Sequence, residues 1–379
     1  MAGIYLHIPF CKQACTYCNF HFSTSLKMKD EMIEALLREI ELTRDYLNGE
    51  AVETIYFGGG TPSLLSADEL NRLFEKIYRT FPIEQLKEVT LEANPDDLSG
   101  AYLKSLRSTP INRFSIGVQS FREEDLRYMH RAHNAQQADY AIKAAQDAGF
   151  ANLSIDLIYG TPGLSDMAWK ENLAKMHSMS IPHFSAYALT VEEGTALHHS
   201  ISKKKTAPVD AAQSAGQFDI LMETAPTLGY EHYEISNLAV PGMYAVHNTA
   251  YWQGKPYLGL GPSAHSFDGK QQRRWNLANN ALYLKSIGEG HIPFEIETLT
   301  PVQRLNEYIM TSLRTMWGCD LKKIAAEWDH HYADQIRESA TEAIEEGKLF
   351  IQNDHLLLTN EGKLFADGLA GDLFQEEAR

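Results

Sequence analysis

The first half of the sequence alternates short apolar segments with longer amphipathic ones. The short segments are rich in β-branched residues and are bounded by Gly, Pro or polar residues, as buried strands are. Apolar residues recur at helical spacing between them. Six strand–helix units in succession predict an α/β fold, in which a parallel sheet curls into an open, partial (β/α)6 barrel. The predicted strands lie at residues 4–8, 54–57, 88–93, 113–118, 153–158 and 184–189.

Capping signals mark the predicted helices. Ser66 and Glu69 have the spacing of a capping box, and Ser99 and Asn134 precede two further amphipathic segments. Gly49 is expected to end the first helix, which we predict at residues 30–48. A sixth helix is expected at residues 166–179.

The pattern changes after about Pro208. A helix is predicted at residues 211–228, where Pro226 is expected to kink or shorten it. Residues 230–275 are dense in aromatic residues, Gly and His and give only short strand signals, and a helix near residues 279–287 follows. The last section predicts helices at residues 302–316, 321–328 and 332–346, then a hairpin and residues 362–374, an outline that resembles a winged helix. We therefore expect three parts: a partial barrel at residues 1–207, an additional α+β segment at 208–298, and a mainly helical, winged-helix-like domain at 299–379.

Composition and charge narrow the classes of function. The 379-residue chain is 44% hydrophobic and carries a net charge of −16, which argues against a nucleic-acid partner despite the winged-helix outline. Four cysteines are too few for a disulfide scaffold, and no stretch has the length of a membrane span. These features predict a cytoplasmic protein in a reducing environment. Peripheral association with a membrane stays compatible with them.

Three of the four cysteines form a candidate metal site. Cys11, Cys15 and Cys18 have the spacing C-x3-C-x2-C and follow the first predicted strand, on the barrel face where active sites gather. Three thiolates can bind three irons of a [4Fe-4S] cluster and leave the fourth iron open. The alternatives are a zinc site completed by His7 or His21 and a thioredoxin-like redox pair, and both explain three clustered cysteines less well.

Polar residues at the ends of other predicted strands indicate a cavity on the same face. Three consecutive glycines lie within residues 57–62, where they let a ligand approach the backbone closely. Glu92 and Gln119 end two strands, and Asp156 lies within a third. Arg131 is a candidate bidentate donor to a carboxylate. Taken singly, each of these polar residues could instead cap a helix or form hydrogen bonds within a loop. The alternative for Arg131 is a solvated arginine on the surface.

Together these motifs resemble the radical S-adenosylmethionine (SAM) superfamily. Residues 117–121, 130–134 and 155–162 narrow the resemblance to one branch of this superfamily. That branch contains the oxygen-independent coproporphyrinogen III oxidases and the HemW-type haem chaperones. The resemblance implies that the cysteines hold a [4Fe-4S] cluster, whose open iron binds SAM and whose electron cleaves it to a 5′-deoxyadenosyl radical. It also implies SAM contacts for ten residues: Tyr5, Tyr17, Gly59, Gly60, Thr61, Glu92, Gln119, Arg131, Asp156 and Ala188.

Several features place the sequence nearer to the chaperones than to the oxidases. The oxidases carry a further cysteine two positions after the third cluster ligand, where this chain has Phe20, and an extension before the loop. In addition, the chain contains the H-N-x-x-Y-W signature that is associated with haem binding in the chaperones. Its residues are His247, Asn248, Tyr251 and Trp252.

His247 is the candidate axial ligand of a haem iron, because a neutral imidazole commonly takes that role. His232, His265 and Cys319 compete for the same role, although a lone cysteine is most often a small buried apolar residue. The alternative is that the signature braces a turn with its first two residues and packs its two aromatic rings in the core. Residues 257–265 are expected to form a second wall of the SAM pocket.

The resemblance therefore implies a haem chaperone that binds a [4Fe-4S] cluster, SAM and haem, and that passes haem to acceptor apoproteins, which we expect in the respiratory chain. One alternative is oxygen-independent coproporphyrinogen III dehydrogenation with a 5′-deoxyadenosyl radical. Another is a metal-bound structural module without SAM chemistry. SAM cleavage is compatible with the motifs, but no catalytic residue is identified. The oligomeric state is expected to be a monomer or a cluster-dependent dimer.

Overall fold

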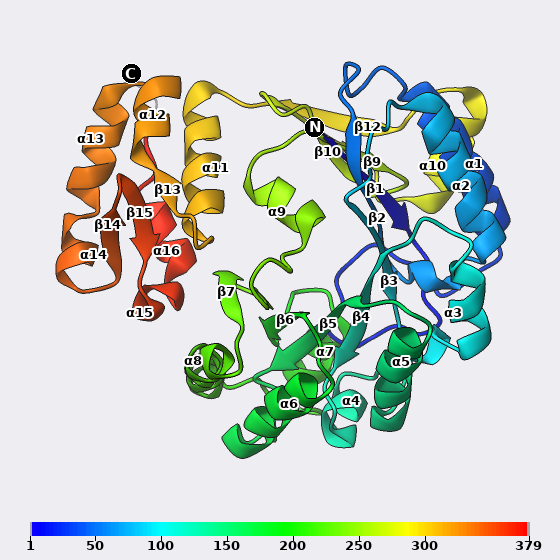
Figure 1. Cartoon of the computed structure of the whole chain (residues 1–379), viewed down its shortest axis with the longest axis horizontal. Coiled ribbons are helices and arrows are strands. Elements are labelled where there is room, and N and C mark those ends of the chain that lie inside the picture. Colours follow the sequence, from blue (N-terminus) through cyan, green and yellow to red (C-terminus); the bar gives the residue numbers. More distant parts are fainter. Residues whose placement is uncertain (1, 377–379) are drawn as a thin grey trace.

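One sheet of twelve strands organises most of the chain in the computed structural model, which describes residues 2–376 (Figure 1). Its central six strands are parallel neighbours in chain order, so the prediction of a partial (β/α)6 barrel is confirmed. The strand β3 has the predicted bounds, and the other five differ from prediction by one or two residues at one end or at both ends. These strands are β1 (Ala2–Ile8), β2 (Val52–Gly59), β3 (Glu88–Ala93), β4 (Arg113–Gln119), β5 (Asn152–Tyr159) and β6 (His183–Ala188).

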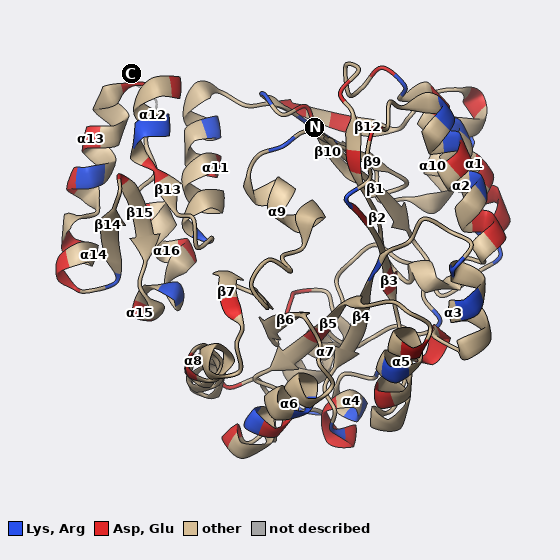
Figure 2. Ribbon diagram, in the orientation of Figure 1, with Lys and Arg blue, Asp and Glu red and all other residues tan. Residues whose placement is uncertain are grey.

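Helices follow these strands and cover the outer face of the sheet. The helices are α1 (Lys29–Leu42), α2 (Ala67–Thr80), α3 (Gly100–Leu106), α4 (Glu123–Tyr128), α5 (Ala135–Asp147), α6 (Asp166–Ser178), α7 (Ala196–Ser202) and α8 (Ala211–Thr227), with 3-10 turns at Pro62–Leu64 and Pro95–Asp97. The apolar faces of most of these helices pack with the strands in one hydrophobic core, whereas Leu126 of α4 and Leu197 of α7 belong to a separate small cluster. Charged residues gather on the solvent side of the helices (Figure 2).

The predicted starts of the barrel helices are confirmed, but the predicted end of the first helix is wrong. Ser66 and Asn134 each form a complete capping box, and the Ser99 side chain caps α3. The first helix ends at Leu42 and not at Asn48, because the chain continues in hydrogen-bonded turns after Thr43, whose hydroxyl donates back to the carbonyl of Glu39. Pro226 lies in the last turn of α8, which ends one residue before the predicted position.

The segment that follows the barrel extends the same sheet at both edges. On one side β9 (Tyr257–Leu260) pairs parallel with β1, and β10 (His265–Phe267), β11 (Gln272–Asn276) and β12 (Phe294–Thr298) add antiparallel strands. On the other side β8 (Asn237–Ala239) and β7 (Glu231–Glu234) follow β6. The H-N-x-x-Y-W motif forms a helix, α9 (Val246–Trp252), and α10 (Asn280–Glu289) lies near the predicted position.

A buried carboxylate attaches this segment to the barrel. Glu39 of α1 accepts hydrogen bonds from the backbone N–H of Gly261 (2.7 Å), the side-chain amide of Asn276 (2.6 Å) and the hydroxyl of Tyr283 (2.6 Å). Burial raises the pKa of Glu39, and the three donors act in the opposite direction. The residue thereby links α1 to β11, to α10 and to the turn after β9.

The C-terminal part has its own hydrophobic cluster, which includes the fully buried Cys319, as expected for a lone cysteine. Helices pack around a three-stranded antiparallel sheet, in agreement with the predicted mainly helical, winged-helix-like domain. The predicted helix at residues 332–346 is divided in two. The elements are α11 (Pro301–Leu313), β13 (Cys319–Asp320), α12 (Leu321–Glu327), α13 (His330–Ser339), α14 (Thr341–Glu345), β14 (Leu349–Gln352), β15 (His355–Leu358), α15 (Asn360–Lys363) and α16 (Ala366–Asp372).

Arg314, directly after α11, joins the C-terminal part to the segment that extends the barrel sheet. Its guanidinium forms ion pairs with the buried Glu234 of β7 (3.2 Å) and with Asp367 of α16 (2.5 Å), and it lies over the ring of Trp252 (5.6 Å). The backbone carbonyl of Arg314 also accepts a hydrogen bond from the N–H of Ile235 (3.1 Å). Among residues 2–376, no helix is long and apolar enough to cross a membrane.

Candidate functional site

The carboxyl ends of the barrel strands open into a cavity of about 940 Å³. The loop after β1 lines one part of it, and Arg314 with residues 363–368 of the C-terminal part lines another. Thirteen of the seventeen site residues predicted from the sequence lie on its wall. They are Cys11, Cys15, Tyr17, Cys18, Gly59, Gly60, Thr61, Glu92, Gln119, Arg131, Asp156, Ala188 and Asn248.

The cysteine loop is tied to the segment that follows α4. The backbone N–H of Thr16 donates to the carbonyl of Met129 (3.1 Å), and the side-chain amide of Gln13 donates to the carbonyl of His130 (2.8 Å). All three thiols are free and partly exposed. Burial raises the pKa of Cys11 to about 11, so an uncompensated thiolate is costly there.

Arg131 supplies a compensating charge. Its guanidinium lies 3.2 Å from the sulfur of Cys15 and donates to the side-chain oxygen of Asn94 (2.8 Å) and to the carbonyl of Gly117 (2.8 Å). Its buried Nε atom has no hydrogen-bond partner. The side chain is therefore held beside the thiols and is not a solvated surface arginine.

This donor set fits an iron–sulfur cluster better than a single ion. In residues 2–376, no three His, Cys, Asp or Glu side chains are arranged to hold a metal ion. The three thiols instead lie along one wall of a large cavity, with a permanent cation at Cys15. A cluster needs thiolates that surround a larger body and benefits from nearby positive charge.

Two carboxyl groups on the barrel wall have perturbed pKa values. Glu92 accepts hydrogen bonds from the hydroxyl of Tyr56 (2.7 Å) and the backbone N–H of Gly59 (3.2 Å). Burial raises the pKa of Glu92 to about 7, and burial raises that of Asp156 to about 6. A cationic ligand in this part of the cavity would favour the ionised form of both groups.

Gly59 must be a glycine for this wall to form. Its φ angle is +106°, and a Cβ atom would lie 2.6 Å from the imidazole ring of His7. The close approach keeps the N–H of Gly59 directed at Glu92.

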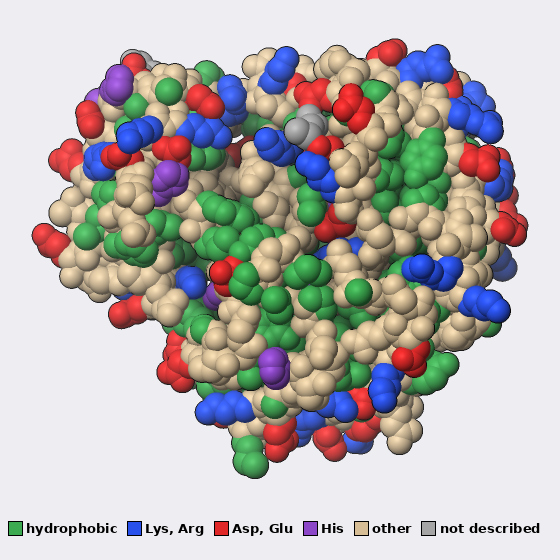
Figure 3. All heavy atoms as spheres, viewed as in Figure 1, with side chains coloured by type: hydrophobic (Ala, Val, Ile, Leu, Met, Phe, Trp, Pro, Cys, Tyr) green, Lys and Arg blue, Asp and Glu red, His purple; other side chains and the backbone are tan. Residues whose placement is uncertain are grey.

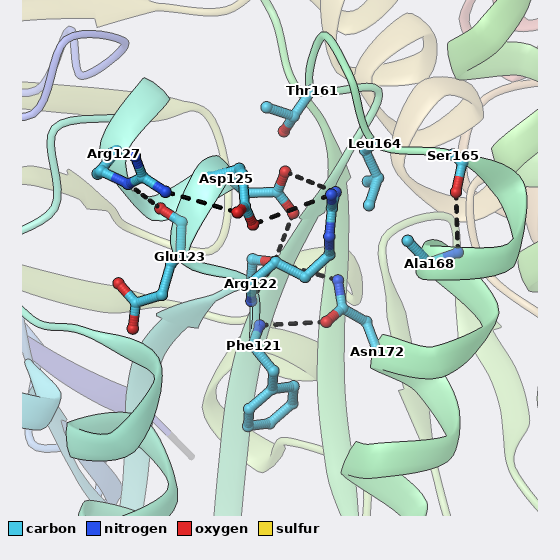
Figure 4. A network of polar contacts seen from close by, with 12 residues as sticks. Phe121, Arg122, Glu123, Asp125, Arg127, Thr161, Leu164, Ser165, Ala168 and Asn172 are labelled. Atoms are coloured by element: carbon cyan, nitrogen blue, oxygen red, sulfur yellow. Dashed lines mark hydrogen bonds and ion pairs between the residues drawn. The ribbon is translucent and has the colours of Figure 1, made fainter.

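Gln119 ends β4 in a left-handed conformation, with a φ of +67°. The turn that follows is held from two helices, as Figure 4 shows: the Phe121 N–H donates to Asn172 of α6 (3.1 Å), and Arg122 pairs with Asp125 of α4 (3.1 Å). The hydroxyl of Ser120 also donates to Asp125 (2.7 Å). These contacts fix the residue that follows the strand and keep Gln119 on the cavity wall.

Two predictions about the wall differ from the structure. Tyr5 does not line the cavity: its ring stacks on that of Tyr56 (6.0 Å between centroids), and its hydroxyl lies 3.2 Å from Nδ1 of His7. The prediction that residues 257–265 form a second wall of the SAM pocket is also wrong. That segment forms β9 and the turn to β10, beside β1, and none of its residues lines the cavity.

His247 lies inside the barrel and is 1% exposed. Its Nδ1 lies 2.7 Å from the hydroxyl of Thr54, its Nε2 lies 2.8 Å from the hydroxyl of Tyr251, and its ring stacks on Tyr56 (5.1 Å). Burial lowers the pKa of His247 to about 3. Both ring nitrogens are therefore occupied, so a haem iron does not fit at His247 in this arrangement. Of the four residues of the motif, only Asn248 lines the cavity.

The competing candidates also lie away from the cavity. His232 bonds through Nε2 to the carbonyl of Ile235 (2.8 Å), the ring of His265 stacks on Trp275 (6.0 Å), and Cys319 lies in the C-terminal core. None of the three lines the cavity.

Several cavity residues were not predicted from the sequence. Tyr56, Ser115 and Ser185 alternate with core residues on the barrel strands, a signal that the sequence does contain. Arg314 and Lys363 gave no such signal, because their place depends on how the C-terminal part packs against the barrel.

Comparison with known proteins gives two family matches. The model of the radical SAM superfamily matches residues 5–176, and that of the HemN C-terminal domain matches residues 299–365. Among curated relatives, the heme chaperone HemW of Bacillus subtilis is 31% identical over 99% of this chain and 100% of its own. The heme chaperone HemW of Escherichia coli is 32% identical over 99% of this chain and 98% of its own.

A solved structure agrees with the fold. Coproporphyrinogen III oxidase (HemN) from Escherichia coli, described as a radical SAM enzyme, superposes with a TM-score of 0.84. The match covers 98% of this chain and 90% of that one at 21% identity. At this level of identity the likeness concerns the fold alone.

The raised pKa of Glu92 predicts a pH-dependent stability. Between pH values of about 4.5 and 7 the folded protein keeps a proton that the unfolded chain releases, so stability is lost as pH rises through 7. In the wild type, the free energy of unfolding should fall by up to roughly 3 kcal/mol between pH 5 and 8 because of this group. Glu92→Gln lacks the titrating group, so its thermal midpoint should fall less over the same pH range. Glu124→Gln, on the exposed side of α4, serves as the control. An unchanged slope in Glu92→Gln would contradict the assignment.

Proposed function

Because the chain belongs to the HemW family of the radical SAM superfamily, we propose that it is a haem chaperone, which binds a [4Fe-4S] cluster, SAM and haem and passes haem to acceptor apoproteins. The observation that carries the proposal is the single cavity, in which the three thiols meet polar residues from the carboxyl ends of β2 to β6. The expected acceptors are haem apoproteins of the respiratory chain.

Cys11, Cys15 and Cys18 would hold the cluster. When bound, it supplies an open iron for the amino and carboxylate groups of SAM and an electron for the cleavage of SAM. Arg131 offsets the negative charge of the thiolates, and its contacts with Asn94 and Gly117 keep it in place without a carboxylate partner.

We assign SAM to the barrel wall of the cavity. Gly59 and Gly60 let the ligand approach the backbone, while Glu92 and Asp156 provide carboxylates that suit its positive charge. Tyr17, Thr61, Gln119, Arg131 and Ala188 complete the proposed SAM contacts on this wall. Tyr5 stacks on Tyr56 and does not line the cavity, so we assign it a supporting role and no direct SAM contact.

We assign haem to the part of the cavity that lies toward the C-terminal residues. Phe20, at the position where the oxidases carry a cysteine, is 68% exposed and offers an apolar ring to a porphyrin. Of the H-N-x-x-Y-W motif only Asn248 lines the cavity, and we assign the direct contact with haem to this residue. His247 could bind the iron only if α9 moved and its bonds to Thr54 and Tyr251 opened.

The cluster assignment predicts a difference between two cysteine variants. After anaerobic reconstitution with iron and sulfide, the wild-type protein should show broad visible absorbance, and Cys15→Ala should lose it. Cys319→Ala is the matched control, because that thiol is buried in the C-terminal core, and it should retain the absorbance. A colourless wild-type protein that holds zinc would overturn the assignment.

The chaperone function predicts transfer. The reconstituted protein, loaded with haem, should pass haem to an apo-cytochrome faster than serum albumin loaded with the same amount does, measured by the absorbance of the holo-cytochrome. Formation of protoporphyrinogen from coproporphyrinogen III and SAM, without haem transfer, would instead establish the dehydrogenase.

A further inference from the structure

Lys363, the last residue of α15, carries a charge on the cavity wall that no carboxylate of the described residues neutralises. Its Nζ atom donates to the side-chain oxygen of Asn360 (3.1 Å) and lies 3.4 Å from Nδ1 of His232. Burial alone accounts for the lowered pKa of Lys363. In a chain with a net charge of −16, a partly buried lysine without an acidic partner is unexpected.

The neighbouring imidazole does not supply the missing negative charge. Nε2 of His232 bonds to the carbonyl oxygen of Ile235 (2.8 Å), so this nitrogen carries the proton and Nδ1 is an acceptor. Burial lowers the pKa of His232 to about 4, and the ring is therefore neutral. An ammonium group has three N–H donors, and these two neutral acceptors use two of them. One donor and the full positive charge remain for a group in the cavity.

The other cations on the cavity wall are already engaged. Arg314 is paired with Glu234 and Asp367, and Arg131 contacts the sulfur of Cys15. Lys363 therefore differs from both in having an available charge.

Apolar residues line the same cavity as this charge. Leu364 and Phe365 follow Lys363 on the cavity wall, and Phe20, Phe22 and Tyr187 line the cavity from the cysteine loop and the end of β6. Phe20 and Phe365 are 68% and 47% exposed. Figure 3 shows hydrophobic side chains gathered on the face between the C-terminal part and the barrel. The wall thus combines exposed aromatic rings with a cation that has no carboxylate partner among residues 2–376.

We propose that Lys363 binds a carboxylate of the cargo, namely a propionate of haem, while the macrocycle lies against the aromatic residues of the same wall. This inference rests on the proposed haem-chaperone function and adds to it the group that recognises the acidic edge of the porphyrin. A porphyrin with two propionates is both flat and apolar over most of its surface and negatively charged at one edge, which matches the wall. The carboxylate of SAM is the competing source of the same chemistry.

The experiment compares ferric haem with its dimethyl ester, in which both propionates are neutral, by absorbance titration of the reconstituted protein. Wild-type protein should bind haem at least about tenfold more tightly than the ester, the effect of one charge-assisted hydrogen bond. Lys363→Met should lose this preference, and Lys363→Arg should retain most of it. Lys322→Met, which removes an exposed lysine paired with Asp354, is the matched control and should behave as wild type.

The outcomes separate this inference from the function on which it rests. If wild-type protein binds neither porphyrin, the haem-chaperone function fails and the role of Lys363 fails with it. If it binds haem and the ester equally, or if Lys363→Met keeps the preference, only the role of Lys363 is overturned. SAM binding should be unchanged in Lys363→Met; its loss, with haem discrimination intact, would assign the lysine to the carboxylate of SAM.

Discussion

The parallel alignment of the six barrel strands is the constraint on which the rest of the structure depends. Parallel strands in one sheet bring all their carboxyl ends to the same edge, so residues separated by long stretches of sequence meet in one cavity. The cysteine loop leaves that edge after β1 and is held there by the backbone after α4. Arg131 follows the same backbone and reaches Cys15, so the segment that anchors the loop also positions the charge that compensates the thiolates.

The cavity has two different walls. The barrel wall is polar, and burial raises the pKa values of Glu92 and Asp156 there. The wall near the C-terminal part exposes aromatic rings and the unpaired Lys363. This division suits one polar cationic ligand and one apolar anionic ligand in the same space. Arg314 matters beyond the C-terminal part because it joins Asp367 of α16 to Glu234 of β7 and so attaches the second wall to the edge of the large sheet.

The sequence predicted the barrel wall well, because local signals determine it. Strand periodicity located Glu92 and Gln119 at strand ends, and the glycine triplet identified a close approach that the φ angle of Gly59 confirms. Contacts between distant segments could not be read in the same way. Nothing local shows that His247 is enclosed by Thr54 and Tyr251, or that Lys363 reaches a cavity that begins at Cys11. Such positions follow from how β9 and the C-terminal part pack against the barrel.

The central claim is that cluster and haem occupy one cavity. Crystals of the anaerobically reconstituted protein with haem bound would test it through anomalous scattering at the iron absorption edge. We expect one iron peak at Cys11, Cys15 and Cys18 and a second in the same cavity, between Phe20 and residues 363–368. A second peak outside the cavity, or at His247 after displacement of α9, would contradict the claim.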